Sequence, residues 1–469
     1  MKKGRPNILI LTSSPLTDRI ILYTRLSEVL KKYCNLEVWA TSYGSEGWCE
    51  LDNDINLFPF PKTIGFREFP VNLLRKINDH AWTFAANNTS KKSMMRHLLD
   101  RKGGVHYRFT KTVGMTIGSL GLEKILESAT RTVALRRDSS PEATQRLSNR
   151  RPHLIVSMGP QLNDERQVIN SAIRLNIPVC AFITSWDNVT TKSRLLYHFD
   201  AIFVWNHNVK DELKSHGMSG SAKIEVVGAP QYDILLNPDY RESRESFCRR
   251  HQLDPEVPIV LAALGMANGI NEIHLAIGLA EIIASGRLGK VQLLVRPHPY
   301  FDSNCELGSI LSRFGDSVRV QSIKNPLLPR NRRGVSREDV IEWVGAFCHA
   351  NVVVHLCSTS AIDAGVFDTP SVCLDFDPSP GREKDSLVKE VNRVWLHYSY
   401  VTATGGMILA DSWDSLEKAV GQYLRNPSLH REARRRMTML VAGKLDGRSA
   451  ERLALAIARV AGAQEPPIE

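Results

Sequence analysis

Three hydroxyl side chains stand in a row at Ser358, Thr359 and Ser360, directly after an apolar run typical of a buried strand. Hydroxyls and free N–H groups at the beginning of a helix suit a diphosphate, because that end of the helix carries partial positive charge. Asp363 follows one turn later, where it accepts hydrogen bonds from ribose hydroxyls or is simply a first-turn acid favoured by the helix dipole. This turn predicts a phosphate-binding site.

A second polar motif, Arg296-Pro-His298-Pro299, ends another apolar run. The prolines restrict the backbone on both sides of His298, so its ring is held with little further loss of conformational entropy. Arg296 and His298 can both donate hydrogen bonds to phosphate oxygens. A satisfied structural histidine is the alternative, but the exit of a buried strand beside an arginine favours a functional role.

The third motif, residues 184–192, places a tryptophan, an acid, an amide, several hydroxyls and a lysine within nine residues. A structural turn needs Asn or Asp, but not this density of functional groups with Trp186 and Lys192 beside them. Asp187 could act as general base toward a hydroxyl, and Lys192 could neutralise a phosphate. We assign Trp186, Asn188 and Lys192 to the binding of a second substrate.

Two weaker motifs complete the candidates. The hydroxyls of residues 12–18, with Ser13 among them, suit an anion at the start of the first helix, although they are equally typical of helix caps. Asp375 and Asp377 follow a later strand, with Arg382 and Lys384 just beyond them. Surface loops often have this composition, so a role for the second set stays open.

The elements that position these motifs are short apolar runs that alternate with longer amphipathic segments. Strands followed by helices of this kind indicate parallel sheets covered on both faces. Two such sets, divided near residue 240, predict an α/β protein with two doubly wound, Rossmann-like domains facing one another across a cleft. We expect a helix over 18–33 and strands over 7–12, 35–40, 153–158, 178–183, 201–205, 223–227, 259–264, 291–296, 318–321, 352–356 and 371–374.

Segment 62–112 departs from this alternation. It holds eleven Lys and Arg against three Asp and Glu, in a chain of 469 residues with a net charge of +10. Three interpretations stay open: an insertion that docks on anionic lipid headgroups or holds a phosphate-bearing acceptor, a solvated basic surface, and nucleic-acid binding. No helix-turn-helix, zinc-finger or RNP signature supports the last, so we expect no nucleic acid. Its interleaved aromatic residues are Phe66, Phe69, Trp82, Phe84, Tyr107 and Phe109.

The eight cysteines form no Cys-x-x-Cys motif, which supports neither a zinc site nor a disulfide framework. The apolar run 8–11 is too short for the core of a signal peptide, and no run approaches the roughly 18 apolar residues of a membrane-spanning helix. We therefore expect a cytoplasmic protein, soluble or peripheral on the inner face of the cytoplasmic membrane.

Taken together, these motifs resemble a known family. The segments 185–192, 296–299, 358–370 and 375–377 are similar to bacterial surface-carbohydrate glycosyltransferases of the GT-B fold. That family is related to the CDP-glycerol glycerophosphotransferases and, more distantly, to the non-hydrolysing nucleotide-sugar 2-epimerases. Residues 445–452 also resemble the start of the last helix in that group. The resemblance covers roughly residues 150–455.

The resemblance implies a nucleotide-sugar donor held by the C-terminal domain. Ser358, Thr359 and Ser360 would hold the diphosphate, Asp363 would stand where many transferases carry a glutamate near the ribose, and Arg296 and His298 would neutralise the leaving group. It also implies that no metal or other cofactor is required. The implied domains are 1–240 on the acceptor side, with a basic helical insertion at about 62–150, 241–440 on the donor side, and 441–469 as a final helix returning to the first domain.

Our main functional hypothesis is therefore a glycosyltransferase that moves a sugar to a cell-surface glycan or lipid-linked acceptor. Asp187 and His298 are its candidate catalytic residues, and Ser13, Trp186, Asn188 and Lys192 line its acceptor side. The alternatives are a 2-epimerase-like isomerase, a CDP-glycerol-type glycerophosphotransferase and a non-catalytic carbohydrate-binding protein.

Overall fold

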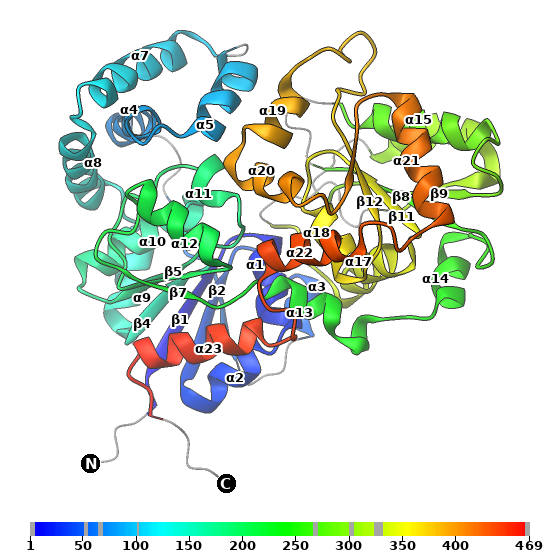
Figure 1. Cartoon of the computed structure of the whole chain (residues 1–469). Helices are drawn as coiled ribbons and strands as arrows, with labels where there is room; N and C mark the ends of the chain where they lie inside the picture. The colour runs from blue at the N-terminus through cyan, green and yellow to red at the C-terminus, as the bar shows by residue number, and fades with distance from the viewer. Residues whose placement is uncertain are drawn as a thin grey trace. The chain divides into compact units, whose positions relative to one another are not determined.

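The structure is a computed structural model that describes residues 5–50, 55–63, 69–100, 103–265, 271–299, 304–322 and 332–464. The chain forms two compact units. Unit 1 consists of Met1–Asp233, Asn331–Val335 and Arg448–Glu469, and unit 2 consists of Ile234–Arg330 and Ser336–Gly447. Each unit has its own sheet and its own core (Figure 1).

Unit 1 is built on a seven-stranded sheet in which every neighbouring pair of strands is parallel. Its order is β3-β2-β1-β4-β5-β6-β7, so the chain reverses direction across the sheet between β1 and β4. The strands are β1 (Asn7–Thr12), β2 (Asn35–Ala40), β3 (Asn56–Pro59), β4 (Leu154–Ser157), β5 (Val179–Phe182), β6 (Ala201–Val204) and β7 (Lys223–Val226).

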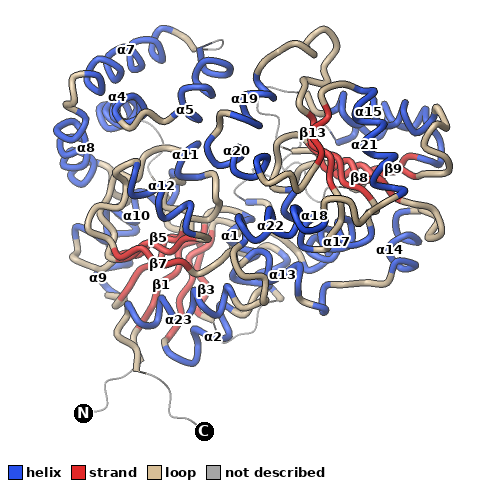
Figure 2. The backbone as a smooth tube through the Cα atoms, viewed as in Figure 1, coloured by secondary structure: helices blue, strands red, loops and turns tan. Residues whose placement is uncertain are grey.

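Helices cover both faces of this sheet, so its central strands are apolar on both sides (Figure 2). Ile8, Leu9, Ile10 and Leu11 of β1 are all at most 2% exposed. The helices of unit 1 outside the segment between β3 and β4 are α1 (Pro15–Tyr23), α2 (Leu26–Tyr33), α3 (Glu46–Cys49), α10 (Asn163–Arg174), α11 (Asn188–Thr191), α12 (His207–Ser215) and α23 (Ser449–Val460), with α13 (Gln231–Leu236) at the junction of the units.

The expected single helix over 18–33 is wrong, because α1 and α2 are separate. Thr24 adopts extended backbone angles at the end of α1, and its hydroxyl accepts from the Leu26 N–H at 3.2 Å. The threonine thus satisfies one of the free N–H groups at the beginning of α2.

The segment between β3 and β4 is a set of helices, which we call the insertion helices. They are α4 (Phe69–Ala85), α5 (Thr89–Met94), the π-helix η1 (Met95–Leu99), α7 (Val105–Ser119), α8 (Glu123–Arg137) and α9 (Pro141–Arg150). Two aromatic side chains expected to be interleaved in a basic surface lie elsewhere: Trp82 is only 1% exposed, and Tyr107 is half-buried with its hydroxyl donating to Asp100. Phe66 and the side chain of Phe69 lie outside the described residues.

Unit 2 is built on a six-stranded parallel sheet with the order β10-β9-β8-β11-β12-β13. The strands are β8 (Ile259–Ala263), β9 (Gln292–Arg296), β10 (Val318–Val320), β11 (Val352–His355), β12 (Ser371–Leu374) and β13 (Ile408–Ala410). Its helices are η2 (Pro238–Tyr240), α14 (Arg244–His251), α15 (Ile273–Ala284), α16 (Asn304–Leu311), η3 (Ser312–Ser317), α17 (Arg337–His349), α18 (Ser360–Val366), α19 (Leu387–Arg393), α20 (Leu396–Ala403), α21 (Trp413–Arg425) and α22 (Arg431–Ala442).

The last helix, α23, belongs to unit 1 although the chain before it belongs to unit 2. It packs against α2, and the Ala450 N–H at its beginning donates to the Asp233 carboxylate at 2.7 Å. Among the described residues, no helix is both long and apolar enough to cross a membrane.

Candidate functional site

In a doubly wound sheet, ligands bind at the carboxyl ends of the strands, where the chain reverses direction across the sheet. That point lies between β8 and β11 in unit 2 and between β1 and β4 in unit 1. The sequence-predicted site residues end strands or lie in the segments that follow them at these carboxyl edges; Asn188 begins α11, Ser360 begins α18, and Asp363 lies inside α18.

In unit 2, three neighbouring strands end in register. Arg296 pairs with Ala263, and Ala263 pairs with His355, so Arg296 and the turn after β11 lie on either side of β8. At the usual strand spacing of about 4.8 Å, the ends of β9 and β11 are separated by roughly 10 Å.

The predicted basic pair occupies the end of β9. Arg296 is half-buried, and its Nη1 donates to Gln321 Oε1 at 2.8 Å. Gln321 also donates from Nε2 to Glu342 Oε2 at 2.9 Å, which fixes the amide and therefore the guanidinium. Pro297 is buried and His298 is half-buried, directly after the end of β9.

The predicted hydroxyl turn is ordered by its own side chains. The Ser360 N–H donates to Ser358 Oγ at 3.2 Å, and the two serine hydroxyls lie 3.1 Å apart. Cys357, just before the turn, has a φ of 37°, in the left-handed region that non-glycine residues seldom adopt. Its N–H donates to Cys373 Sγ at 3.4 Å, which helps to hold this unusual conformation.

The carboxylate of Asp363 is buried, whereas a residue that binds a ribose would be accessible at the surface of the site. Its side chain is only 7% exposed, and its Oδ2 accepts from the indole Nε1 of Trp343 at 3.2 Å. This bond joins α18 to α17 within unit 2. Of its two predicted roles, the geometry favours the structural one.

A buried acid in unit 2, Glu272, was not predicted. It lies just before α15 and is 6% exposed, and its Oε2 accepts from the Gly265 N–H at 2.5 Å. Burial raises the pKa of this carboxyl to about 7, while the Gly265 bond opposes the rise. Because Gly265 follows β8, the acid stands at the strand between Arg296 and the hydroxyl turn. In the sequence, Glu272 looks like any acid near the beginning of a helix.

This acid predicts a pH effect on unit 2. A carboxyl with a folded-state pKa near 7 keeps its proton between pH 4.5 and 7, whereas in the unfolded chain it is ionised there. The free energy of unfolding should therefore fall by about 3 kcal/mol as the pH rises through this window, since each unit of pKa is worth about 1.4 kcal/mol. Urea titrations of the wild type and Glu272→Gln at pH 5.0 and 8.0 test this, with the amide variant losing less stability. Parallel losses in both proteins would contradict it.

The carboxylates of Asp375 and Asp377 are paired with arginines. Asp375 contacts Arg393 Nη2 at 2.5 Å, and Asp377 contacts Arg382 Nε at 3.3 Å. These ion pairs indicate that Asp375 and Asp377 stabilise the loops after β12. Within the described ranges, no group of three or more His, Cys, Asp or Glu side chains could hold a metal ion.

In unit 1, the point of reversal between β1 and β4 is filled by a carboxylate of the protein itself. Glu165, in the first turn of α10, accepts hydrogen bonds from Ser13 Oγ at 2.7 Å, Ser157 Oγ at 2.5 Å and the Gly159 N–H at 3.0 Å. Its side chain is completely buried, and burial raises its pKa to about 7. The Ser13 hydroxyl, predicted for the acceptor side, therefore binds a carboxyl group of the protein itself.

The predicted motif 184–192 forms the loop after β5 together with α11. Asp187 accepts from the Ser185 hydroxyl and, at 3.0 Å, from Thr191 Oγ1, so its carboxylate is held within the loop. Trp186 is buried, Asn188 is half-buried and Lys192 is exposed. Ser13, Trp186, Asp187, Asn188 and Lys192 thus share the carboxyl edge of one sheet, while Arg296, His298 and the hydroxyl turn share that of the other.

A second carboxyl, Glu212, accompanies Asp187. It lies on α12, which packs against α11, and is only 4% exposed. Burial, together with the nearby negative charge of Asp187, raises the pKa of Glu212 to about 8. One acid of the pair is thus protonated at neutral pH. Sequence spacing could not reveal the pair, because the two residues are on different helices.

The insertion helices hold this loop from outside. Asn88 Nδ2 donates to the Thr190 carbonyl at 3.1 Å, and Lys91 Nζ donates to the Lys192 carbonyl at 3.0 Å and to Asp79 Oδ2 at 2.5 Å. Lys91 is only 5% exposed. Lys91, predicted as part of a basic surface, is therefore buried in unit 1 and binds groups of the protein itself.

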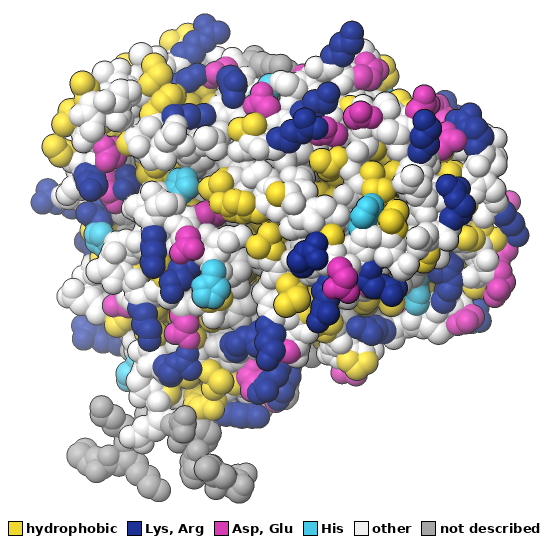
Figure 3. Space-filling view, viewed as in Figure 1, with side chains coloured by type: hydrophobic (Ala, Val, Ile, Leu, Met, Phe, Trp, Pro, Cys, Tyr) yellow, Lys and Arg dark blue, Asp and Glu magenta, His cyan; other side chains and the backbone are white. Residues whose placement is uncertain are grey.

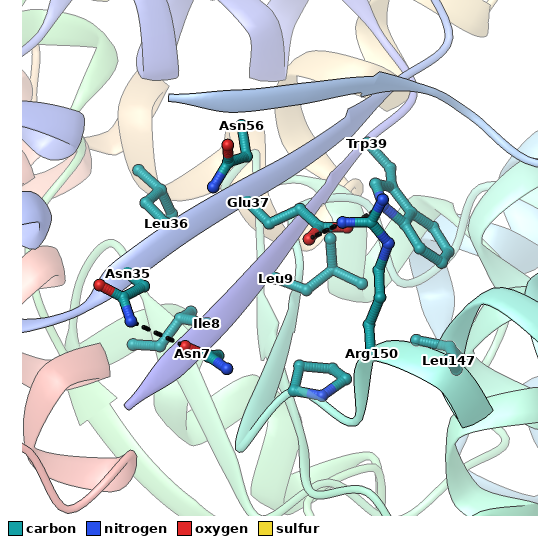
Figure 4. Close-up of a pocket in the computed structure, with 11 residues that line it drawn as sticks. Asn7, Ile8, Leu9, Asn35, Leu36, Glu37, Trp39, Asn56, Leu147 and Arg150 are labelled. Atoms are coloured by element: carbon teal, nitrogen blue, oxygen red, sulfur yellow. Dashed lines mark hydrogen bonds and ion pairs between the residues drawn. The ribbon is translucent and has the colours of Figure 1, made fainter. Parts of the chain in front are cut away.

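A pocket of about 300 Å³ lies at the opposite, amino end of the unit 1 sheet (Figure 4). Four of its polar side chains form two pairs: Arg150 Nη1 lies 2.7 Å from Glu37 Oε2, and Asn35 Nδ2 donates to Asn7 Oδ1 at 2.9 Å. Strands of a doubly wound sheet present their ligand sites at the other end, so this pocket is not the candidate site.

No protein-family model and no curated protein matches the sequence. Solved structures match over nearly the whole chain. One from Listeria monocytogenes, provisionally named a UDP-N-acetylglucosamine 2-epimerase, has a TM-score of 0.55 at 12% identity and covers 99% of both chains. Another UDP-N-acetylglucosamine 2-epimerase has a TM-score of 0.54 at 12% identity, covering 100% of this chain and 99% of that one. MnaA of S. aureus in complex with UDP has a TM-score of 0.52 at 10% identity and covers 97% of each chain.

At this identity the likeness concerns the fold. The predicted class, α/β with two Rossmann-like parallel sheets of the GT-B type, is confirmed.

Proposed function

We propose that the protein is an enzyme that binds a nucleotide sugar at unit 2 and acts on it. The observation that carries this proposal is the register of β9, β8 and β11, which sets Arg296 and His298 on one side and the Ser358–Ser360 turn on the other. Basic groups and hydroxyls at this spacing suit a diphosphate. The structure of MnaA, which contains UDP, supports uridine diphosphate as the nucleotide.

Isomerisation of the sugar is the chemistry that the comparisons favour, because the similar structures include two named as UDP-N-acetylglucosamine 2-epimerases. An isomerase needs one group that accepts a proton and one that donates it. We assign Asp187, in the loop after β5, to this proton transfer.

Transfer of the sugar to an acceptor hydroxyl is the second candidate. It is favoured by the resemblance of residues 185–192 and 358–370 to surface-carbohydrate glycosyltransferases. In this reaction Asp187 accepts the proton of the acceptor hydroxyl as that oxygen attacks the anomeric carbon. His298 and Arg296 stabilise the charge that develops on the departing phosphate. Among the predicted acceptor residues, Asn188 and Lys192 are accessible to a glycan or lipid-linked acceptor.

NMR of UDP-N-acetylglucosamine incubated with the purified protein separates the two candidates. A second UDP-sugar that appears without any acceptor identifies an isomerase. UDP release that requires an added membrane-derived acceptor identifies a transferase. If the sugar nucleotide is unchanged under both conditions and UDP does not bind, the enzyme proposal is wrong.

Within the proposed site, His298→Ala and Ser360→Ala should each lower turnover by about 100- to 1,000-fold, the usual effect of removing one donor to a developing anion. Both side chains lie at the sheet edge, so circular dichroism of the variants should match the wild type. Ser312→Ala, an exposed serine of the same unit, is the matched control and should retain full turnover. Wild-type rates in the two site variants would refute the assignment.

A further inference from the structure

The insertion helices carry an apolar face that the described residues of unit 1 leave exposed. The inner side of α7 is lined by Thr110, Gly114 and Gly118, all buried. A Cβ added at Gly118 would lie 2.4 Å from the Ala81 carbonyl oxygen, so α7 meets α4 at backbone distance. With the small residues turned inward, the large apolar residues of α7 are on its outer side.

Five exposed apolar residues of α7, α8 and the turn between them define what we call the α7–α8 face. Val105 is 85% exposed, Phe109 53%, Leu120 66%, Leu122 44% and Ile125 69%. In a helical projection at about 100° per residue, Val105, Phe109 and Leu120 fall on one stripe opposite the glycines. Eleven large hydrophobic residues are exposed among the described residues, and six lie between positions 105 and 125. A concentration of this kind marks an interaction surface rather than scattered surface residues.

The charge around the α7–α8 face is positive. Residues 103–137 contain six Lys and Arg and only two Glu. Arg108, Lys124 and Arg136 are exposed, whereas Glu127 is turned to Arg194, 2.7 Å away. Figure 3 shows hydrophobic side chains over α7 and α8 with Lys and Arg between them.

We propose that the α7–α8 face docks on an anionic phospholipid surface. Its apolar side chains enter the headgroup region, and the surrounding Arg and Lys side chains bind the lipid phosphates. A second copy of the chain fits less well, because it would bring two positive rims together. The α7–α8 face differs from the surface predicted at 62–112. The predicted surface includes Trp82 and Lys91, which are buried, whereas the α7–α8 face extends to Ile125.

Co-sedimentation of the full chain with vesicles tests the proposal. Wild-type protein should bind vesicles containing 30% phosphatidylglycerol at least tenfold more strongly than pure phosphatidylcholine vesicles, and 0.5 M NaCl should weaken this binding. The double variant Phe109→Ser/Ile125→Ser should lose at least tenfold in affinity, because two large apolar side chains no longer enter the interface. Arg108→Gln/Lys124→Gln should lose the preference for the anionic lipid.

Tyr43→Ser is the matched control, since this exposed aromatic residue of unit 1 lies outside the α7–α8 face and its loss should leave binding unchanged. Failure of the wild type to sediment with either vesicle overturns the proposal. So does concentration-dependent dimerisation that the double variant abolishes, which would make the face a self-interface. UDP affinity, measured on the same variants, should stay at the wild-type value, so this test is separate from that of the proposed function.

Discussion

Replacement of Glu165 by alanine is expected to lower the free energy of unfolding of unit 1 by about 4 kcal/mol. The carboxylate accepts hydrogen bonds from Ser13, Ser157 and the Gly159 N–H in a completely buried position. Its loss leaves three buried donors without their acceptor, each at a cost of about 1–3 kcal/mol before the hydroxyls reorient. A urea titration of the full chain measures the effect, and hydrogen exchange in β1 and β4 assigns it to unit 1.

Two further variants serve as comparisons for Glu165→Ala. Glu165→Gln keeps the shape and one acceptor oxygen, so it should lose about half as much stability. Glu28→Ala removes an acid of the same unit whose side chain is 51% exposed in an ion pair with Arg25, and such pairs contribute about 0–1 kcal/mol. If Glu165→Ala is no less stable than Glu28→Ala, the Glu165 carboxyl group does not hold the two loops together.

The second large effect concerns binding. Arg296→Ala should raise the dissociation constant of UDP by about 30- to 100-fold, since a charge-assisted hydrogen bond to phosphate contributes roughly 2–3 kcal/mol. Isothermal titration calorimetry measures the change directly. Arg296→Lys should be intermediate, because it keeps the charge but loses the planar fork of the guanidinium.

Arg319→Ala is the control for that experiment. Arg319 lies on the neighbouring strand β10 and pairs with Asp316 at 2.8 Å, so its removal should change UDP affinity by less than about twofold. Unchanged affinity in a folded Arg296→Ala protein would remove the end of β9 from the site. Weakened binding in Ser360→Ala would then assign the nucleotide to the turn after β11 alone.

The central strands could be predicted from the sequence because parallel strands covered on both faces are apolar throughout. Val352, Val353 and Val354 of β11 are all 0% exposed, as a run of consecutive valines in the sequence predicts. β3 and β13 were missed. They are edge strands of four and three residues, half-buried along most of their length, so no apolar run marks them.

The site was predictable in part for the same reason. Ser358–Ser360 and Arg296-Pro-His298 follow central strands, so their location at a carboxyl edge could be inferred from local sequence. Glu165 could not be found in this way. It stands 152 residues from Ser13, and in its own helix it looks like an acid favoured by the helix dipole. Its function depends on two loops that only the tertiary fold brings together.

The carboxylate of Glu165 has a thermodynamic consequence. A domain that receives its anion from a ligand becomes more stable as the ligand concentration rises, by RT ln(1 + [L]/Kd). In unit 1 the Glu165 carboxyl group is part of the chain, so the hydrogen bonds that it accepts form without a ligand. Under the proposed function the nucleotide stabilises unit 2 alone, so the melting temperature of unit 2 should rise as UDP is added while that of unit 1 stays constant.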